Sequence, residues 1–349
     1  MPGKVEPMIW HSSRSAVQPG RGAIIGERKE GTLRADGLGM NALLGLLHDV
    51  TGIEGSFRIE RAPTGKFNET FFVDSQELDH PLVLRVAPAE DRAAMLFYEH
   101  RMMRQEPEIH QRVRAETSMP IPEVAYFEEN NERLGRDVIL MERLPGEPSY
   151  RMDGSSMLTE LGAKLREVHD VVVAEPGRYG YLGPHAPMAA QSTWLEAFVV
   201  MWHALLDDIE RCRGASQEEL TAWRRLLEER VGCFDHYPGR ASLLHMDVWA
   251  ENILSDEGGR LTGLVDWDRA VWGDPEIEFA VLDYCGVSTE SFWEGYGRRR
   301  PTDGDAQVRR NFYLLYEVLK YIVIRIARDG DHARAARYRD MAWQLANQI

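Results

Sequence analysis

The residues of this chain whose types and spacing suit chemistry lie between positions 243 and 266. His245, Asp247 and Asn252 occur within eight residues, and Asp266 follows Asn252 after a further fourteen. Carboxylate and amide oxygens are the hard ligands that Mg²⁺ prefers, so Asn252 and Asp266 suit a magnesium ion that also binds phosphate oxygens and water. A second carboxylate that does not bind the metal, Asp247, can orient a substrate hydroxyl and accept its proton. The set therefore favours phosphoryl transfer.

A β-hairpin is predicted between Asn252 and Asp266. Residues 253–254 can begin a strand, residues 256–259 are rich in turn formers, and residues 261–265 can return as the partner strand. Such a hairpin brings Asn252 beside Asp266 at its open end. Two other interpretations fit single residues of the set: an acidic loop that only turns a corner, and the His-x-Asp pair of a hydrolytic metal site. The second lacks further histidine ligands nearby.

The same segment resembles a known family. The chain reads HMDVWAEN at 245–252 and VDWDRAVWGDPEIE at 265–278. These segments resemble the motifs H-G-D-x4-N and I-D-W-x-x-A-x-x-G-D-P-x-x-D of the aminoglycoside phosphotransferase-like kinases, which include enzymes of the choline kinase type. Protein-kinase motifs are the more distant relatives. The resemblance covers residues 55–325. It implies an α+β, protein-kinase-like bilobal fold that binds ATP or GTP with Mg²⁺ in a cleft and phosphorylates a hydroxyl of a small molecule.

The resemblance also assigns residues to roles. Asp247 corresponds to the catalytic base, and Asn252 and Asp266 correspond to the magnesium ligands. His245 is expected to brace the loop through hydrogen bonds rather than to titrate in catalysis. Residues 273–275 resemble the start of the helix that follows the second motif, and their Gly-Asp-Pro sequence suits an N-cap and a first helical turn.

Two positions depart from the family pattern, and one acidic residue is added. Met246 replaces the usual Gly, which affects the packing of the loop but leaves the chemical residues in place. Glu278 stands where the family usually has Asp, which leaves the bracing hydrogen bond of that position open. Asp268, two residues after Asp266, is a candidate contact for metal or substrate, with a solvated or structural role as the alternative.

The pattern of apolar residues divides the chain into three parts. Residues 1–39 are rich in Gly, Pro, Ser and Arg and carry a net charge of +2, and we interpret them as a flexible extension. Residues 40–144 should form a β-rich lobe, and residues 145–349 a mostly helical lobe with a β-rich segment at 243–265. A cleft between two such lobes is the expected place for a site.

Predicted elements follow from periodicity and turn signals. In the first lobe the predicted strands are 57–60, 70–73, 82–86, 124–127 and 138–141, and the predicted helices are 40–51 and 91–114. In the second lobe the predicted helices are 156–169, 193–211, 217–230, 276–282, 308–327 and 332–347.

The β-rich lobe should hold the nucleotide. Gly65 and Asn68 lie in a turn that resembles the family's G-x-x-N turn over the phosphates, although an ordinary hairpin turn fits the local pattern as well. Arg85 stands where kinase-like folds usually place a phosphate-pairing Lys, and its guanidinium fork can hold phosphate oxygens. Glu99 is its expected ion-pair partner.

The remaining candidates concern the base and the acceptor. Met141 and Leu144 end the last strand of the lobe, where they either contact the nucleotide base or belong to the core. The helix at 193–210 carries Trp194, Glu196 and Trp202, an aromatic and acidic set that could receive a polycationic sugar. The alternative is an amphipathic helix with a core aromatic stripe and a solvated acidic end.

The composition of the chain limits the classes of partner that it can bind. The chain has 349 residues, with 41 Lys and Arg against 56 Asp and Glu and a net charge of −15. It therefore lacks the positive footprint of a protein that binds nucleic acid or an anionic membrane. No apolar run approaches the roughly 20 residues of a membrane span, and no secretory h-region is present. Three scattered cysteines indicate a reducing compartment, the cytoplasm.

Two functions of different class remain. The first is a small-molecule O-kinase whose acidic cleft favours an amine-bearing acceptor, such as an aminoglycoside, another basic antibiotic or an amino alcohol. The second is a kinase-like binding or regulatory protein that holds nucleotide without turnover. The intact set of Asp247, Asn252 and Asp266 argues against the second, because binding alone requires no base.

Overall fold

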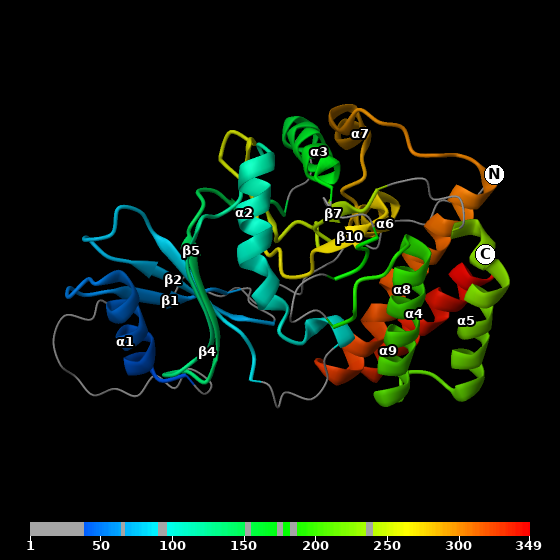
Figure 1. Cartoon of the computed structure of the whole chain (residues 1–349), viewed down its shortest axis with the longest axis horizontal. Coiled ribbons are helices and arrows are strands. Elements are labelled where there is room, and N and C mark those ends of the chain that lie inside the picture. Colours follow the sequence, from blue (N-terminus) through cyan, green and yellow to red (C-terminus); the bar gives the residue numbers. More distant parts are fainter. Residues whose placement is uncertain are drawn as a thin grey trace. The chain divides into compact units, whose positions relative to one another are not determined.

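The computed structural model of the chain describes residues 38–63, 67–89, 96–150, 155–172, 177–181, 187–234 and 240–349 (Figure 1). The chain divides into two compact units. The first comprises Met1–Glu90 and Pro122–Leu144, and the second comprises Asp91–Ile121 and Pro145–Ile349. One division falls at the expected boundary, whereas residues 91–121 group with the mostly helical unit and not with the β-rich one. The extension expected at residues 1–39 lies outside the described residues except for its last two.

The first unit is an antiparallel sheet with one helix. Its strands are hydrogen-bonded in the order β1-β2-β3-β5-β4. The bounds are α1 Met40–Thr51, β1 Arg58–Arg61, β2 Glu69–Asp74, β3 Leu82–Val86, β4 Val124–Asn131 and β5 Arg136–Glu142. The five strands predicted from the sequence are confirmed, although β3 and β5 are buried along nearly their whole length and do not alternate.

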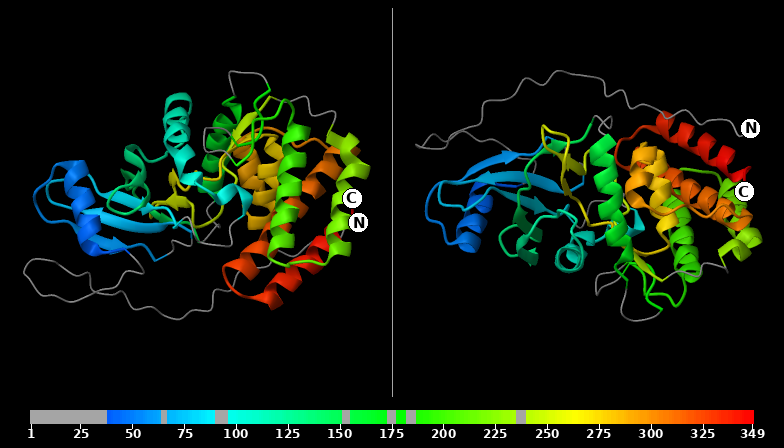
Figure 2. Two further views of the ribbon diagram at one scale, coloured as in Figure 1. Left: turned by 60° about the horizontal axis from the view of Figure 1, so that its bottom comes forward. Right: turned by 90° about the horizontal axis from the view of Figure 1, so that it is seen from above.

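Alternate residues of the central strands face α1. Leu84 of β3 and Leu140 of β5 pack with the apolar stripe of α1 in one core, and Figure 2 shows the helix along the sheet. Successive side chains of a strand point to opposite faces. Arg85, Ile139 and Met141 therefore lie on the face opposite α1, and Arg85 is paired in register with Ile139.

The second unit is mostly helical. Its α-helices are α2 Glu106–Glu116, α3 Ser155–Asp170, α4 Trp194–Arg211, α5 Gln217–Arg230, α6 Pro275–Cys285, α7 Glu290–Tyr296, α8 Gly304–Ala327 and α9 His332–Ala346. Its short strands are β6 Glu147–Pro148, β7 Ser242–Leu244, β8 Ile253–Ser255, β9 Leu261–Leu264 and β10 Val271–Gly273. The six helices predicted for residues 145–349 are confirmed, and α7 and the short strands β6 and β10 are additions.

The helix predicted over residues 91–114 is wrong over residues 96–105. Residues 90–95 lie outside the described part, and the next residues form two 3₁₀ turns, Phe97–Glu99 and Met102–Gln105. The α-helix begins only at Glu106, with Pro107 in its first turn. Proline is favoured there because the first turn has no use for its missing N–H.

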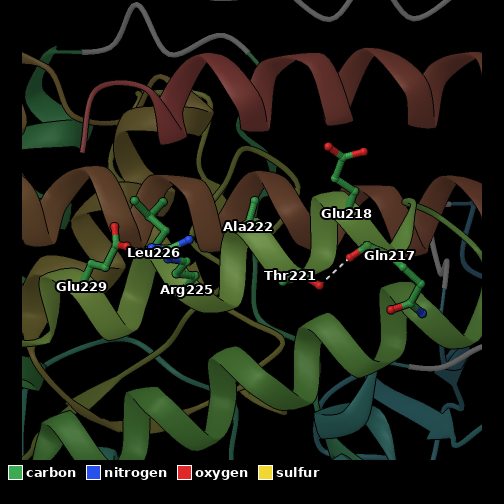
Figure 3. A pocket seen from close by; sticks show the side chains of 7 residues that line it. All are labelled: Gln217, Glu218, Thr221, Ala222, Arg225, Leu226 and Glu229. Atoms are coloured by element: carbon green, nitrogen blue, oxygen red, sulfur yellow. Dashed lines mark hydrogen bonds and ion pairs between the residues drawn. The ribbon is translucent and has the colours of Figure 1, made fainter.

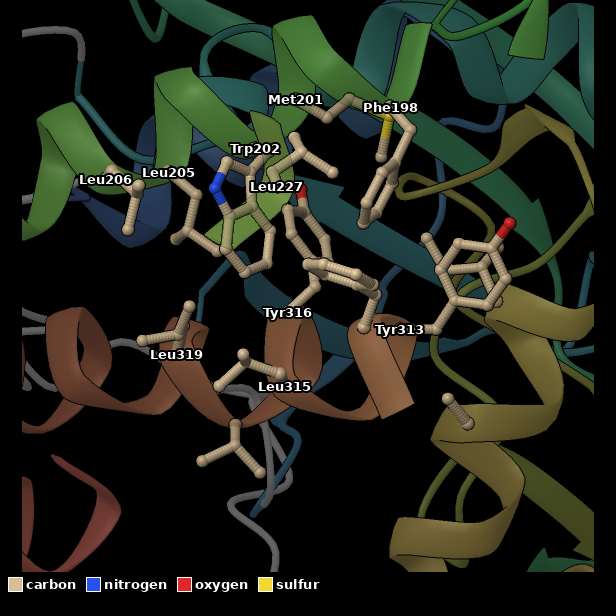
Figure 4. Packing of buried hydrophobic residues seen from close by; sticks show 14 of the residues in the cluster. Phe198, Met201, Trp202, Leu205, Leu206, Leu227, Tyr313, Leu315, Tyr316 and Leu319 are labelled. Atoms are coloured by element: carbon tan, nitrogen blue, oxygen red, sulfur yellow. The ribbon is translucent and has the colours of Figure 1, made fainter. Parts of the chain in front are cut away.

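The largest core of the second unit lies between α4, α5, α8 and α9. Aromatic side chains dominate it: Phe198 and Trp202 of α4 pack with Tyr313 and Tyr316 of α8 (Figure 4). Aromatic side chains bury large areas and pack edge to face, which gives such a core a defined arrangement. In the part of the chain that the structure describes, no helix combines the length and apolarity of a membrane span.

Candidate active site

The hairpin expected between Asn252 and Asp266 is present. β8 pairs with β9 in antiparallel register. The Val265 N–H donates to the Asn252 carbonyl oxygen at 3.0 Å, which closes the open end of the hairpin. Asp266 is the next residue, so the two side chains leave the hairpin at the same end. Local turn chemistry and strand pairing therefore place this pair, as the sequence indicates.

Each carboxylate oxygen of Asp247 has a hydrogen-bond donor. Asn252 donates through Nδ2 to Oδ2 at 3.0 Å and to the Asp247 carbonyl oxygen at 2.9 Å. Arg269 donates through Nη1 to Oδ1 at 2.8 Å, and the two side chains are 17% and 18% exposed. Because the amide nitrogen of Asn252 faces Asp247, its amide oxygen is directed away from Asp247 and is available to a cation.

His245 braces the loop from beneath. It is fully buried, and its Nδ1 accepts a hydrogen bond from the Asp247 N–H at 3.1 Å. Its Nε2 then carries the proton and donates to the Val265 carbonyl oxygen at 3.0 Å. The ring also packs edge to face on Trp267, with centroids 4.5 Å apart. Burial lowers the pKa of His245, so the ring is neutral and acts as scaffold, as expected.

Met246 and Glu278, the two departures from the family pattern, contact each other. Met246 has φ +66°, in the left-handed region that favours glycine. Its N–H donates to Oε1 of Glu278 at 2.5 Å, and Oε2 of Glu278 contacts Nε2 of His169 at 2.5 Å. The bracing hydrogen bond left open by the sequence is therefore present, made by a fully buried Glu.

Three carboxylates gather beside this loop. One oxygen each of Glu106, Asp266 and Asp268 lies within 4.8 Å of the other two. Glu106 and Asp268 are buried, and Asp266 is half-buried. We call these residues the carboxylate cluster. Hard oxygen donors at this spacing suit Mg²⁺. Sequence reasoning missed Glu106, and the signal that could have found it is Pro107, which marks a helix start at this position.

Arg269 is the second residue that sequence reasoning missed. Its main chain is fixed on both sides by Gln105, whose buried Nε2 donates to the carbonyl oxygens of Asp268 at 2.5 Å and of Ala270 at 3.1 Å. Burial disfavours the charge of Arg269, but chiefly the carboxylate of Asp247 offsets this and raises the pKa of Arg269 above its ordinary value. The guanidinium is therefore a permanent cation beside Asp247.

The nucleotide candidates belong to the first unit, except for Glu99. Asn68 is buried directly before β2, and Arg85 and Met141 share the sheet face opposite α1. Leu144 is half-buried two residues after the end of β5. Gly65 lies outside the described residues. These positions leave the prediction of a nucleotide site on this sheet in place without testing it.

Glu99 lies in a different element from the one expected. Its Oε2 accepts the Leu96 N–H at 2.8 Å, and its Oε1 forms an ion pair with Arg328. Both oxygens therefore have partners inside the second unit. The expected ion pair of Glu99 with Arg85 stays a prediction that these contacts do not test, because a carboxylate oxygen accepts more than one hydrogen bond. The residue is carried by the 3₁₀ turn Phe97–Glu99 and not by the expected helix.

The three acceptor candidates of α4 require correction. Glu196 accepts the Thr193 N–H at 3.1 Å and completes a capping box at the start of α4. Trp194 is buried and donates to the Tyr313 hydroxyl at 2.7 Å, and Trp202 is fully buried. Figure 4 shows Trp202 among core side chains. The amphipathic alternative, a helix with a core aromatic stripe, therefore holds.

A surface groove along α5 contains none of the predicted site residues. Figure 3 shows its side chains, which are Gln217, Glu218, Thr221, Ala222, Arg225, Leu226 and Glu229. Arg225 and Glu229 form an ion pair at 2.7 Å across one turn of the helix. Such pairs are common on solvated helix faces, so the groove does not compete with the loop at Asp247 as a site.

Known sequences resemble this chain over part of their length. A probable ketoamine kinase of Staphylococcus aureus is 24% identical over 183 residues, which are 50% of this chain and 62% of that protein. Hygromycin-B 4-O-kinase of Escherichia coli is 26% identical over 186 residues, 48% of each chain. The chain thus spans 62% and 48% of the length of these curated relatives.

Solved structures resemble nearly the whole chain. A putative fructosamine-3-kinase from Haemophilus somnus superposes with a TM-score of 0.64 at 18% identity and covers 88% of this chain and 96% of that one. The aminoglycoside phosphotransferase APH(4)-Ia also gives 0.64 at 18% identity, with 88% and 98% covered. These likenesses establish an α+β, protein-kinase-like fold.

A family profile gives the assignment by sequence. The profile of the phosphotransferase enzyme family matches residues 58–309. This range includes both motifs, the hairpin and all three residues of the carboxylate cluster. This match extends over more than half of the chain and agrees with the fold. The chain therefore belongs to the phosphotransferase enzyme family.

Proposed function

We propose that the chain is a small-molecule kinase that transfers the γ-phosphoryl group of ATP or GTP to a hydroxyl of an amine-bearing acceptor. The observation that carries this proposal is the set of contacts around Asp247. A carboxylate that is fixed by an amide and a guanidinium, and that lies in the loop leading to Asn252 and Asp266, is suited to orient a hydroxyl and accept its proton.

The metal belongs to the same proposal. The amide oxygen of Asn252 and the carboxylate of Asp266 would hold Mg²⁺, with Asp268 and Glu106 as neighbouring carboxylates. The bound ion supplies charge neutralisation for the phosphate oxygens. His245 keeps the loop in position, and Glu278 fixes the strained turn at Met246.

The first unit would bind the nucleotide. Arg85 is suited to pair with phosphate oxygens, and it shares a sheet face with Met141, whose side chain would contact the base with Leu144. Asn68, with Gly65 in the same turn, would supply the phosphate contacts. The second unit would then provide the catalytic loop and the acceptor site. Scattered cysteines fit work in a reducing cytoplasm.

An amine on the acceptor is supported by charge and by the relatives. The chain carries a net charge of −15, which attracts cations at a distance. The names of the relatives, ketoamine kinase and hygromycin-B kinase, describe enzymes for small amine-bearing molecules. Because α4 contributes its tryptophans to the core, the amine must be recognised elsewhere than at Trp194 or Trp202.

The deciding experiment compares wild type with Asp247→Asn. With Mg-ATP or Mg-GTP and a panel of amine-bearing hydroxyl compounds, the variant should lose about two to four orders of magnitude in transfer rate while keeping nucleotide affinity. The exposed residue Glu218 provides a control, Glu218→Gln, which should act like wild type. A protein that binds nucleotide but releases no diphosphate with any acceptor, before or after the substitution, would support the regulatory alternative instead.

A further inference from the structure

Asp247 shares its Oδ1 with a cation that the proposed reaction does not require. Asn252 is fixed to Oδ2 and to the main chain of Asp247, so Oδ1 is the oxygen that an acceptor hydroxyl would approach. In the described structure Nη1 of Arg269 donates to that oxygen at 2.8 Å. A hydroxyl that is to donate its proton there competes with a charge-assisted hydrogen bond, which is among the stronger kinds.

The position of Arg269 is built into the fold. Gln105 donates to the carbonyl oxygens on both sides of it, at 2.5 and 3.1 Å, and is itself buried. The guanidinium is only 17% exposed, so it cannot swing far into solvent. A side chain that only balanced surface charge would need neither the burial nor the two fixed carbonyls.

We propose that Arg269 is a positioning residue that guards Asp247: it occupies Oδ1 while no acceptor is bound, and the hydroxyl of the acceptor displaces it. The proposal rests on the proposed kinase function. In the guarded state the guanidinium competes with water for Oδ1 of Asp247, so Arg269 reduces wasteful transfer of the phosphoryl group to water. Protection against such side reactions is a general need of phosphoryl transfer.

The step balances without another reactant. The acceptor O–H proton passes to Oδ1 of Asp247 as the acceptor oxygen forms a bond to the γ-phosphorus. The bond between that phosphorus and the β–γ bridging oxygen breaks, and its electron pair stays on the nucleoside diphosphate. Asp247 then returns the proton to solvent, and Arg269 donates to Oδ1 again.

The displaced guanidinium limits the class of acceptor. A largely buried cation that loses its carboxylate partner needs another oxygen to accept its hydrogen bonds. The acceptor should therefore present a second oxygen on the carbon next to the reacting hydroxyl. An ammonium group at that carbon would be repelled by Arg269, so the amine of the acceptor should be located farther along the molecule.

The test measures nucleoside diphosphate release from Mg-ATP without any acceptor. Arg269→Gln should raise this release by about three- to tenfold, and it should raise the KM for an acceptor with the second oxygen by about threefold or more, because the contact with that oxygen is lost. The combined variant Arg269→Gln with Asp247→Asn should lose the increase, because the freed base causes it. Arg260→Gln removes an exposed Arg that pairs with Asp256 in the hairpin turn and is the matched control, with both values unchanged.

A second readout separates positioning from folding. Arg269→Lys keeps the charge and should restore part of the suppression. In Arg269→Ala, added guanidinium ion at millimolar concentration should reduce acceptor-free release toward the wild-type rate. If Arg269 is purely structural, the free ion should leave the acceptor-free release of Arg269→Ala unchanged. That outcome would overturn the proposal.

The acceptor class is tested with two probes that share one carbon skeleton. Wild type should transfer to 3-amino-1,2-propanediol at least about fivefold faster than to 1,3-diamino-2-propanol, and Arg269→Gln should lose this preference. Equal or faster transfer to the diamine would contradict the inference.

The two proposals fail in different ways. If acceptor-free release is unchanged or lower in Arg269→Gln while Asp247→Asn still abolishes transfer, only the guarding role is wrong. If Asp247→Asn leaves transfer intact, the proposed function is wrong.

Discussion

Glu278 holds Met246 in a left-handed conformation through a hydrogen bond of 2.5 Å between the Met246 N–H and Oε1. The φ angle of Met246 is +66°, which costs a non-glycine residue about 1–2 kcal/mol. The other oxygen of Glu278 contacts His169, whose Nδ1 lies 2.9 Å from the hydroxyl of Tyr296. The strain at the residue before Asp247 is thus maintained by a buried network that starts on α6 and reaches α3 and α7.

Removing the carboxylate should damage fold and site together. Glu278→Ala leaves the Met246 N–H and the ring of His169 without their buried partner, and we expect a loss of about 2–5 kcal/mol in the free energy of unfolding. Glu278→Asp is one methylene shorter and should retain only one of the two contacts, with an intermediate loss. Urea unfolding and initial rates check both variants. A loss below about 1 kcal/mol for the Ala variant would contradict the network.

A pair of substitutions at Met246 isolates the backbone strain. Met246→Gly and Met246→Ala both remove the buried side chain, so their difference reports the conformation alone. The Gly variant should be more stable than the Ala variant by about 1 kcal/mol, since only glycine adopts this φ without a Cβ penalty. Thermal unfolding of the two variants, side by side, gives the measurement. Equal stability, or a more stable Ala variant, would mean that the turn relaxes.

Asp266→Asn tests the metal assignment. Replacing one carboxylate of the cluster should weaken the magnesium-dependent part of ATP affinity by about tenfold or more, because the phosphate loses the ion that bridges it to the protein. Titration calorimetry with and without Mg²⁺ separates that part from the rest. Asp256→Asn, in the turn of the same hairpin, serves as control. If ATP affinity depends on Mg²⁺ equally in wild type and in Asp266→Asn, Asp266 is not a magnesium ligand.

Asp274 should make stability depend on pH. It is buried at the start of α6, where it accepts the Glu276 N–H at 3.0 Å and the Tyr313 hydroxyl at 2.8 Å. Burial raises the pKa of Asp274 from 3.8 to about 6. A raised pKa means that the folded state binds the proton more tightly, so the contribution to stability is present below about pH 4 and is lost as pH rises through about 6.

The measurement compares wild type with Asp274→Asn between pH 4 and 7.5. Relative to the variant, wild type should gain about 3 kcal/mol in the free energy of unfolding as pH falls through this window. Asp303, the N-cap of α8, is the control of opposite sign, because a hydrogen bond from the Ala306 N–H lowers its pKa. Relative to Asp303→Asn, wild type should show a flat difference between pH 7.5 and 4 and should lose stability only as pH falls below about 4. A flat difference for Asp274 would show that its carboxylate is not buried in solution.

The sequence was informative where local chemistry decides the structure. Turn residues and alternating apolar residues predict the hairpin from Asn252 to Asp266, and the closing bond at Val265 follows from that register. The pattern also predicts the bracing by His245, because a His two residues before Asp247 can reach its N–H. For helices with a clear periodic apolar face, the predicted bounds agree closely with the bounds in the structure.

The sequence was uninformative where distant segments meet. Gln105 contacts the Asp268 carbonyl across 163 residues, and only that contact shows why Arg269 is aimed at Asp247. Glu106 is also hidden from a local reading, because its place beside Asp266 and Asp268 depends on where α2 begins. Trp194 fits either a pocket or a core by its type and spacing, and the packing against Tyr313 decides for the core.

With the tryptophans of α4 in the core, we propose a different place for the amine of the acceptor. Tyr150 is 61% exposed beside the catalytic loop, after the strand that pairs with β8. Partial loss of solvent around Tyr150, followed by the negative charges of Glu251 and Glu147, raises its pKa. An exposed aromatic ring beside two carboxylates suits an ammonium group.

Glu251→Gln and Glu147→Gln should therefore raise the KM for amine-bearing acceptors by about three- to tenfold each, while kcat changes less than twofold, because the contact is equal in ground and transition states. The effect should shrink at about 1 M salt, where the screening length falls to about 3 Å. Neutral acceptors should show no change, and Glu218→Gln on α5 should leave all values unchanged. A rise in KM of equal size for neutral and amine-bearing acceptors would show that these glutamates shape the loop and do not recognise the amine.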